Sequence, residues 1–149
     1  MLIAIFGENC TGKSTLANVL KQKLGAAVYT GKDYLRLARN EAEAQQRFRA
    51  LLRESVSAPD STIYIISEAD HLDFLPAGCI RVLVTAPLDD IKSRFAARMN
   101  GVLPAAVASR LERSHGAFDR FPHHIEIRTG ERHILEDCAH ILALVDGRG

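Results

Sequence analysis

The segment between residues 7 and 14, GENCTGKS, most constrains how this chain can fold. It follows the short apolar run at 2–6 and precedes apolar residues that recur at helical spacing until Gly25. A buried strand, a glycine-containing loop and a helix in this order place successive backbone N–H groups around one point. The sequence therefore predicts a strand at 2–6, a helix from 14 to 24, and an anion-binding loop between them.

This segment fits the pattern GxxxxGK[S/T], the Walker A motif or P-loop. The pattern predicts that Lys13 bridges the β- and γ-phosphates of ATP and that the hydroxyl of Ser14 binds Mg²⁺. A glycine-rich turn with an incidental lysine is the alternative, and the strand and helix around the segment disfavour it. The residues expected to bind the nucleotide are Gly7, Glu8, Asn9, Cys10, Thr11, Gly12, Lys13, Ser14 and Thr15.

The rest of the chain alternates between strand-like and helix-like segments. Strands are expected at 26–30, 62–67, 80–84 and 124–128. Helices are expected at 33–56, at 87–100, from 104 onward and at 131–145, with a short helix or loop at 70–76. Such alternation predicts a parallel α/β sandwich formed by one domain of 149 residues.

Composition excludes several other classes of protein. A net charge of +1 does not favour a nucleic-acid partner, and no apolar run is long enough to span a membrane. The first residues lack the positive region of a secretory signal. The three cysteines have no CxxC spacing, so neither a disulfide framework nor a zinc site is expected. We therefore expect a cytoplasmic protein, monomeric or homodimeric, with a small-molecule partner.

A carboxylate at the end of a buried strand is the second expected Mg²⁺ ligand. Glu68 follows the apolar run TIYIIS directly, which makes it the candidate. An acidic residue after a strand is equally often a solvated loop residue or a helix cap, so both interpretations stay open.

Four arginines are spaced for a mobile lid formed by residues 88–114. Arg94 and Arg98 share one helix face, and Arg110 and Arg113 share a face of the next helix. Guanidinium groups bind transferring phosphates well because they are planar and permanently charged. Lys13, Arg94, Arg98 and Arg110 are therefore the expected catalytic residues. The alternative is that the arginines are solvated helix faces beside an apolar stripe.

Residues 30–36, TGKDYLR, resemble the TGDxLR segment of adenylate kinases, in the nucleoside-monophosphate kinase superfamily, with one residue inserted. In that family the threonine and the arginine contact the acceptor nucleotide. The resemblance implies that Thr30 and Arg36 contact the acceptor, with Asp33 nearby. Glu68 is also expected among the acceptor-binding residues.

The second half of the chain is similar to guanylate kinase and to the ribose bisphosphate kinase of phosphonate metabolism. Residues 86–98 and the segment VASRLER at 107–113 resemble their arginine-bearing helices. HIEIR at 124–128 resembles their last strand, which implies that Arg128 lies beside the adenine, where these enzymes have asparagine. Residues 32–59 lack their β-rich guanine-binding insert, so GMP specificity is not implied. The resemblance implies a three-layer α/β/α P-loop NTPase fold with a five-stranded parallel sheet.

The expected activity is that of an ATP-dependent kinase, a phosphotransferase. The favoured acceptor is a nucleoside monophosphate, and a nucleoside, a ribosyl phosphate or another small metabolite is the alternative. An ATP-binding regulatory module or a slow ATPase is the alternative from another class, because the P-loop by itself indicates nucleotide binding and not the reaction.

Overall fold

The computed structural model describes residues 1–147, and its central element is the strand β1 (Leu2–Phe6). All five of its residues are buried. Successive side chains of a strand point to opposite faces, so Phe6 packs on one side of the sheet while Ile3 and Ile5 pack on the other. Burial on both faces explains why this strand is apolar throughout.

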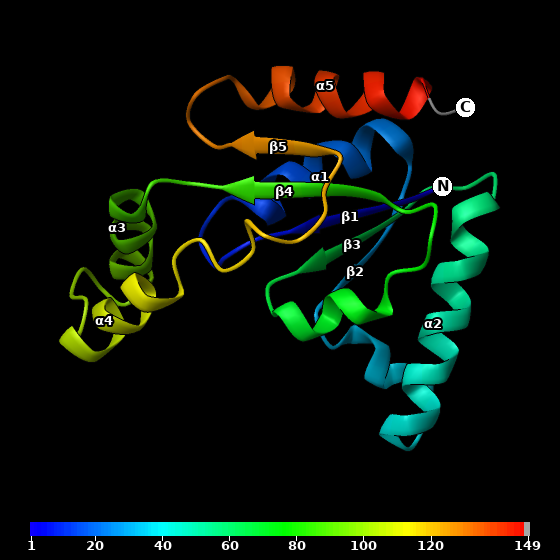
Figure 1. Ribbon diagram of the computed structural model, residues 1–149, viewed down its shortest axis with the longest axis horizontal. Helices are drawn as coiled ribbons and strands as arrows, with labels where there is room; N and C mark the ends of the chain where they lie inside the picture. Colours follow the sequence, from blue (N-terminus) through cyan, green and yellow to red (C-terminus); the bar gives the residue numbers. More distant parts are fainter. Residues whose placement is uncertain (148–149) are drawn as a thin grey trace.

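The sheet contains five parallel strands in the order β2-β3-β1-β4-β5. β1 lies between β3 (Thr62–Ile66) and β4 (Ile80–Thr85), and the edge strands are β2 (Ala27–Thr30) and β5 (Ile125–Arg128). Because all strands run in one direction, their carboxyl ends share one edge, and the arrowheads in Figure 1 point toward it. In folds of this kind ligands bind at that edge.

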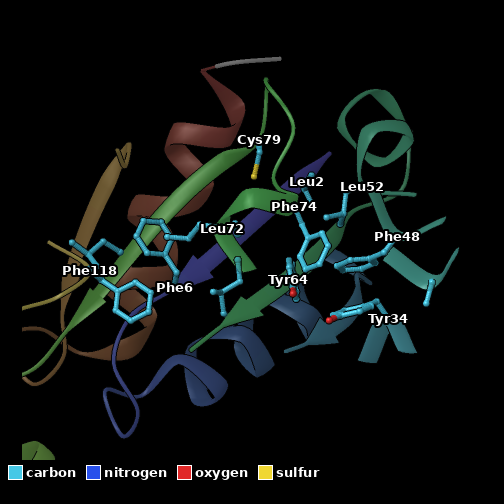
Figure 2. Close-up of a cluster of buried hydrophobic side chains, with 14 residues drawn as sticks. Leu2, Phe6, Tyr34, Phe48, Leu52, Tyr64, Leu72, Phe74, Cys79 and Phe118 are labelled. Atoms are coloured by element: carbon cyan, nitrogen blue, oxygen red, sulfur yellow. The ribbon is translucent and has the colours of Figure 1, made fainter. Parts of the chain in front are cut away.

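Helices cover both faces of the sheet. On one face α1 (Lys13–Leu24) and α5 (Ile134–Asp146) bury an aliphatic core rich in isoleucine and leucine. On the other face lie α2 (Glu41–Ser57) and the 3₁₀ helices η1 (Asp33–Leu37) and η2 (Ala69–Phe74). This second core is aromatic: Phe48 lies edge-on to Tyr64, with ring centroids 4.9 Å apart, and also contacts Phe74 (Figure 2). The fold is therefore a three-layer α/β/α sandwich.

Two helices, α3 (Leu88–Arg98) and α4 (Ala105–Ser114), extend past the carboxyl edge of the sheet (Figure 1). Lys92 on α3 and Glu112 on α4 form an ion pair of 2.5 Å that joins the two helices. Ile91 anchors α3 in the protein, whereas α4 has no buried residue. This pair of helices is the segment that the sequence predicts as a lid.

The expected helix at 33–56 is wrong in one respect, because the chain breaks it after η1. Ala38 is extended, with φ −157° and ψ 167°, and α2 begins only at Glu41. The side chain of Asn40 accepts a hydrogen bond of 2.8 Å from the backbone N–H of Glu43, which satisfies a free donor of the first turn. This cap makes a separate helix start more favourable than a continuous helix.

The last helix likewise starts later than expected, at Ile134 instead of residue 131. The ring nitrogen of His133 accepts a hydrogen bond of 3.2 Å from the N–H of Leu135, so His133 acts as the cap. Residues 129–133 are thereby left in the connection after β5, next to the P-loop. None of the helices within residues 1–147 combines the length and apolar character needed to cross a membrane.

Candidate nucleotide-binding site

The P-loop folds tightly against the end of β4. A Cβ atom at Gly7 would overlap the carbonyl oxygen of Val84, so only glycine fits this approach. Gly12 has φ +98° and Cys10 has φ +64°, backbone conformations in which the chain curls back on itself. The hydroxyl of Thr11 donates a hydrogen bond of 2.9 Å to the carbonyl of Glu8 and closes the loop internally. The loop is therefore shaped by contacts among its own residues and with β4.

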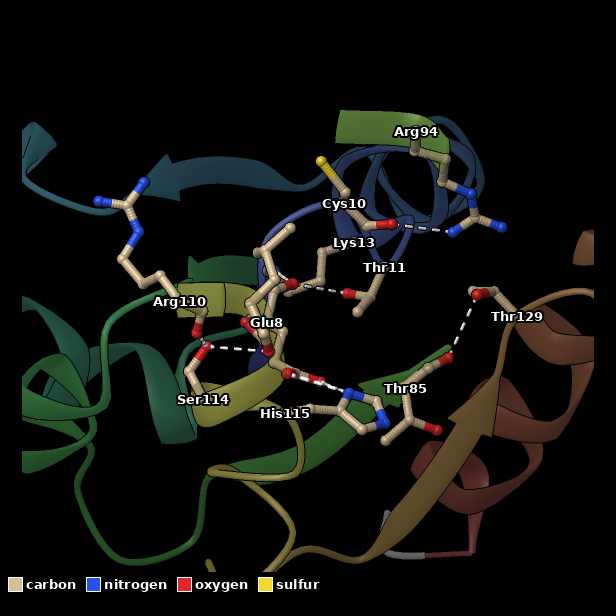
Figure 3. A network of polar contacts seen from close by, with 12 residues as sticks. Glu8, Cys10, Thr11, Lys13, Thr85, Arg94, Arg110, Ser114, His115 and Thr129 are labelled. Carbon is tan, nitrogen blue, oxygen red and sulfur yellow. Dashed lines mark hydrogen bonds and ion pairs between the residues drawn. The ribbon is translucent and has the colours of Figure 1, made fainter. Parts of the chain in front are cut away.

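Lys13 is the buried charge of the loop, with only 5% of its surface exposed. Its ammonium donates hydrogen bonds to the carbonyl oxygens of Gly7 at 2.8 Å and Glu8 at 2.5 Å (Figure 3). Burial lowers the pKa of Lys13 to about 8, and the nearby Arg98 contributes to the lowering. A negatively charged phosphate beside this ammonium would stabilise its protonated form.

Helix α3 is fastened to the loop by two contacts. The guanidinium of Arg94 donates a hydrogen bond of 2.9 Å to the carbonyl oxygen of Cys10 (Figure 3). The side chain of Cys10 is buried together with Ala86 and Ile91, and Phe95 packs against them. These contacts hold one arginine of the predicted lid at the loop.

A cleft of about 440 Å³ opens between the P-loop, α3 and the start of α5. Its polar lining comes from the loop, from Arg94 and Arg98, and from the connection that follows β5. Leu16, Ile127 and Ile134 supply its apolar lining. A cleft that combines apolar surface with a few polar groups beside a phosphate-binding loop suits the nucleoside part of a nucleotide.

A second cleft, of about 450 Å³, lies on the other side of this connection and is rich in carboxylates. The structure places Arg128 in this second cleft and not in the lining of the first. Neighbouring residues of a strand face opposite ways, so Ile127 points toward the cleft at α1 while Arg128 points away. Arg128 instead lies 3.5 Å from Glu126 and 3.9 Å from Glu131.

Glu8 also faces the second cleft and lies 3.2 Å from the ring of His115 (Figure 3). This contact connects the P-loop to the segment that returns from α4. The backbone carbonyl of Glu8 accepts hydrogen bonds from Thr11 and Lys13 within the loop, while its carboxylate lies beside His115. Asn9 is exposed.

The two expected Mg²⁺ ligands are both open to solvent. Ser14 is exposed in the first turn of α1, and the side chain of Glu68 is 63% exposed. A hydroxyl and a carboxylate at the phosphate edge fit a hard cation that takes most of its ligands from phosphate and water. Within residues 1–147 no group of three His, Cys, Asp or Glu residues could hold a metal by itself.

The expected acceptor residues lie at the carboxyl ends of β2 and β3. The carboxylate of Asp33 accepts a hydrogen bond of 2.8 Å from the N–H of Thr30 and so shapes the turn after β2. The side chain of Arg36 is exposed, and Glu68 lies 3.7 Å from the ring of His71. The four residues share one edge of the sheet with the P-loop.

The remaining lid arginines differ from Arg94. Arg98 lines the 440 Å³ cleft. Arg110 and Arg113 are exposed on α4, and in Figure 3 the guanidinium of Arg110 points away from Lys13. A catalytic role for Arg110 therefore stays a prediction that requires movement of α4.

Three residues of the connection after β5 and one residue of α5 line the cleft although no sequence motif marks them: Thr129, Gly130 and Arg132, and Asp137 of α5. Thr129 approaches the loop so closely that a Cβ at Gly12 would lie 3.1 Å from its methyl group. The only signal in the sequence is the Thr-Gly turn directly after the last strand. Burial of Asp137 becomes visible only when α5 packs beside α1.

Comparison with known proteins agrees with this architecture. No protein-family model matches the sequence, and no curated protein sequence matches it. Among solved structures, an uncharacterized protein from Eubacterium ventriosum superposes with a TM-score of 0.69 at 15% identity over 98% of both chains. Shikimate kinase from Acinetobacter baumannii, solved with shikimate, gives 0.66 at 19% identity over 99% of this chain and 93% of its own. A sugar kinase from Janibacter gives 0.62 at 17% identity over 97% and 94%.

The chain has the fold of small P-loop kinases. The match spans nearly the whole chain, so α3 and α4 belong to the shared architecture. At 15% to 19% identity the similarity concerns this fold and leaves the reaction to be argued from the site. The expected fold class, a three-layer P-loop NTPase fold with a five-stranded parallel sheet, is thereby confirmed.

Proposed function

We propose that this protein is an ATP-dependent kinase that transfers the γ-phosphoryl group to a small acceptor molecule. The observation that carries the proposal is the buried ammonium of Lys13, held by two loop carbonyls beside a cleft of nucleoside size. Burial of a charge is costly unless a function or a partner uses it. Phosphate groups of ATP supply that partner.

Phosphoryl transfer depends mainly on positioning and on stabilising the charge of the phosphoryl group as it moves. In this proposal the loop N–H groups and Lys13 hold the β- and γ-phosphates, and Arg94 and Arg98 add positive charge from α3. Mg²⁺, when bound, neutralises phosphate charge, and Ser14 and Glu68 are the residues that would hold it. Closure of residues 88–114 would add Arg110 and exclude water, which suppresses hydrolysis.

The acceptor is proposed to bind at the ends of β2 and β3. A nucleoside monophosphate is the first candidate, because the exposed guanidinium of Arg36 suits a phosphate group. A small hydroxylated metabolite is the second. It is supported by the similarity to the shikimate kinase and sugar kinase folds, and the Asp33 carboxylate can accept a hydrogen bond from a hydroxyl.

The proposal is tested by measuring ADP release from Mg-ATP with a panel of nucleoside monophosphates, nucleosides, ribose phosphates and sugar acids. The Lys13→Ala protein serves as the blank, and its melting temperature shows that it is folded. Release that depends on one acceptor class, and that is lost in the blank, identifies a kinase and its acceptor. Clear ATP binding with ADP release that ignores every acceptor would instead identify an ATPase or a regulatory module.

A further inference from the structure

Asp137 is a buried acid in the cleft that the proposed function assigns to the nucleoside. It lies in the first turn of α5, is 5% exposed, and lines the 440 Å³ cleft opposite the P-loop. Its neighbours along α5, Cys138 and Ile141, are fully buried in the aliphatic core. Asp137 is therefore as buried as a core residue, although its side chain is a carboxylate that borders the cleft.

The described part of the chain gives the Asp137 carboxylate no hydrogen-bond donor and no ion pair. Arg132 and His140 are close enough to favour its charged form, but the guanidinium of Arg132 contacts the ring of His140, 2.7 Å away. Burial is the larger influence and raises the pKa of Asp137. A carboxylate in so enclosed a position normally receives hydrogen bonds, and the Asp137 oxygens stay accessible from the cleft, where a ligand can supply the donor.

We propose that Asp137 accepts a hydrogen bond from an exocyclic amino group on the base of the donor nucleotide, and so selects that base. The inference rests on the proposed function, because it takes the 440 Å³ cleft as the nucleoside site. A carboxylate only accepts hydrogen bonds, so it pairs with the 6-amino group of adenine or the 2-amino group of guanine. A base that lacks the amino group leaves the carboxylate buried without a partner.

The lining of the cleft favours the base over the ribose at this position. Leu16, Ile127 and Ile134 line the same cleft as Asp137, and of these Ile134 is only half-buried, so it leaves apolar surface open to a ligand. A flat base gains by covering this apolar surface, whereas ribose hydroxyls favour the solvated part of the cleft.

The test uses pairs of nucleotides that differ by one amino group. Dissociation constants are measured by calorimetry for ATP against purine riboside triphosphate, and for GTP against ITP. For the wild-type protein we expect the amino-bearing member of one pair to bind about tenfold tighter or more, the size of a hydrogen bond to a charged group. The pair that shows this ratio tells whether adenine or guanine is read.

In Asp137→Ala the ratio is expected to fall to about one, and in Asp137→Asn to an intermediate value, because an amide oxygen still accepts a neutral hydrogen bond. Glu136→Ala is the matched control, since Glu136 is an exposed acid in the same turn and is outside the cleft lining. Its ratio should equal that of the wild type. Melting temperatures confirm that each variant is folded, and Asp137→Asn keeps the side-chain size if the alanine variant is unstable.

Equal ratios in the wild type and in both Asp137 variants would overturn the inference while leaving the kinase proposal intact. The inference is also overturned if Asp137→Ala changes the affinity ratio of ATP to 2′-deoxy-ATP but leaves the ratios of the amino pairs as in the wild type. That result would assign the carboxylate to the ribose. Absence of any nucleotide binding by the wild-type protein would instead overturn the proposed function, and the inference with it.

Discussion

The two sides of the carboxyl edge of the sheet are built differently. On the side proposed to bind the donor nucleotide, Lys13 and Arg94 bond to the carbonyl oxygens of the P-loop, and Cys10 is buried against α3. On the side proposed to bind the acceptor, Arg36 and Glu68 are exposed. Asp33 bonds to the neighbouring turn instead of to the loop. The same sheet edge thus has one half whose side chains are held by contacts within the protein, here called the rigid half, and one half whose side chains are exposed, here called the open half.

The difference separates groups that contacts within the protein hold in place from groups that are exposed to solvent. Groups fixed in advance lose little freedom on binding and stabilise charge without rearrangement. Exposed side chains must be ordered by the ligand, which lowers the affinity that each contact adds. We therefore expect substitutions on the donor side to have large effects on nucleotide binding, and substitutions on the acceptor side to have smaller effects confined to the acceptor.

Replacing Gly7 by alanine should break the rigid half most severely. The added Cβ overlaps the Val84 carbonyl, so the loop must shift, and overpacking of this kind costs roughly 1–3 kcal/mol. ADP affinity, measured by calorimetry, should fall by up to about a hundredfold. Gly101→Ala is the control: it also has positive φ but no atom lies within 4 Å of an added Cβ, and its affinity should be nearly unchanged. Wild-type affinity in Gly7→Ala would contradict the tight loop.

Arg94→Ala compared with Arg110→Ala tests whether the two lid helices contribute unequally. Arg94 bonds to the loop in the free protein, so its loss should weaken ATP binding and lower kcat/KM by about a hundredfold, as loss of a preorganised donor does. Arg110 is exposed on α4 and its guanidinium points away from Lys13 (Figure 3), so its loss should leave the Kd for ATP unchanged. If Arg110 acts only after closure, kcat alone falls; equal Kd losses in both variants would show that α4 already contacts the nucleotide.

Nucleotide affinity should depend on pH through Lys13. Its pKa of about 8 means that the free protein progressively loses this ammonium above pH 8. Binding to phosphate favours the protonated form, so the Kd for ADP should rise by about tenfold from pH 7 to pH 9, one pH unit above the pKa. In Lys13→Arg the guanidinium stays charged and the profile should be flat over this range. A flat wild-type profile would contradict the lowered pKa.

The same lowered pKa has a consequence for folding with a definite sign. Between pH 8 and the ordinary lysine value of 10.5, the unfolded chain binds a proton that the native chain has released. The titration of Lys13 should therefore increase the free energy of unfolding of the nucleotide-free protein as pH rises through this window. Urea unfolding of the wild type and Lys13→Arg at pH 8 and pH 10 separates this contribution from other titrations.

The smallest effect is expected on the acceptor side. Arg36→Ala removes an exposed guanidinium and should raise the KM of the acceptor about fivefold, the scale of one solvent-exposed charge contact, with the Kd for ATP unchanged. Arg53→Ala, an exposed arginine near the far end of α2, is the control and should leave both constants unchanged. A change in ATP affinity in Arg36→Ala would show that the two halves of the site are not separate.

Local patterns in the sequence were sufficient for most of the fold. β1 is apolar because it is buried on both faces, and Gly25 ends α1 in a left-handed conformation, so both elements are readable from the residues themselves. The helix expected at 33–56 failed because Asn40 can cap a helix or lie inside one, and only packing of η1 and α2 against the sheet selects the cap. The spacing of apolar residues along the chain does not specify whether Asn40 caps a helix or lies inside one.

The sequence by itself determined the P-loop, because a strand, a glycine loop and a helix are consecutive and their geometry is local. The tertiary structure alone decided which distant residues join it. Arg94 reaches the loop across 84 positions, whereas Arg110 does not, and Asp137 instead of Arg128 enters the cleft beside it. These assignments depend on which strand face points toward α1 and on how α3 and α5 dock, and such long-range packing leaves no periodic signature in the chain.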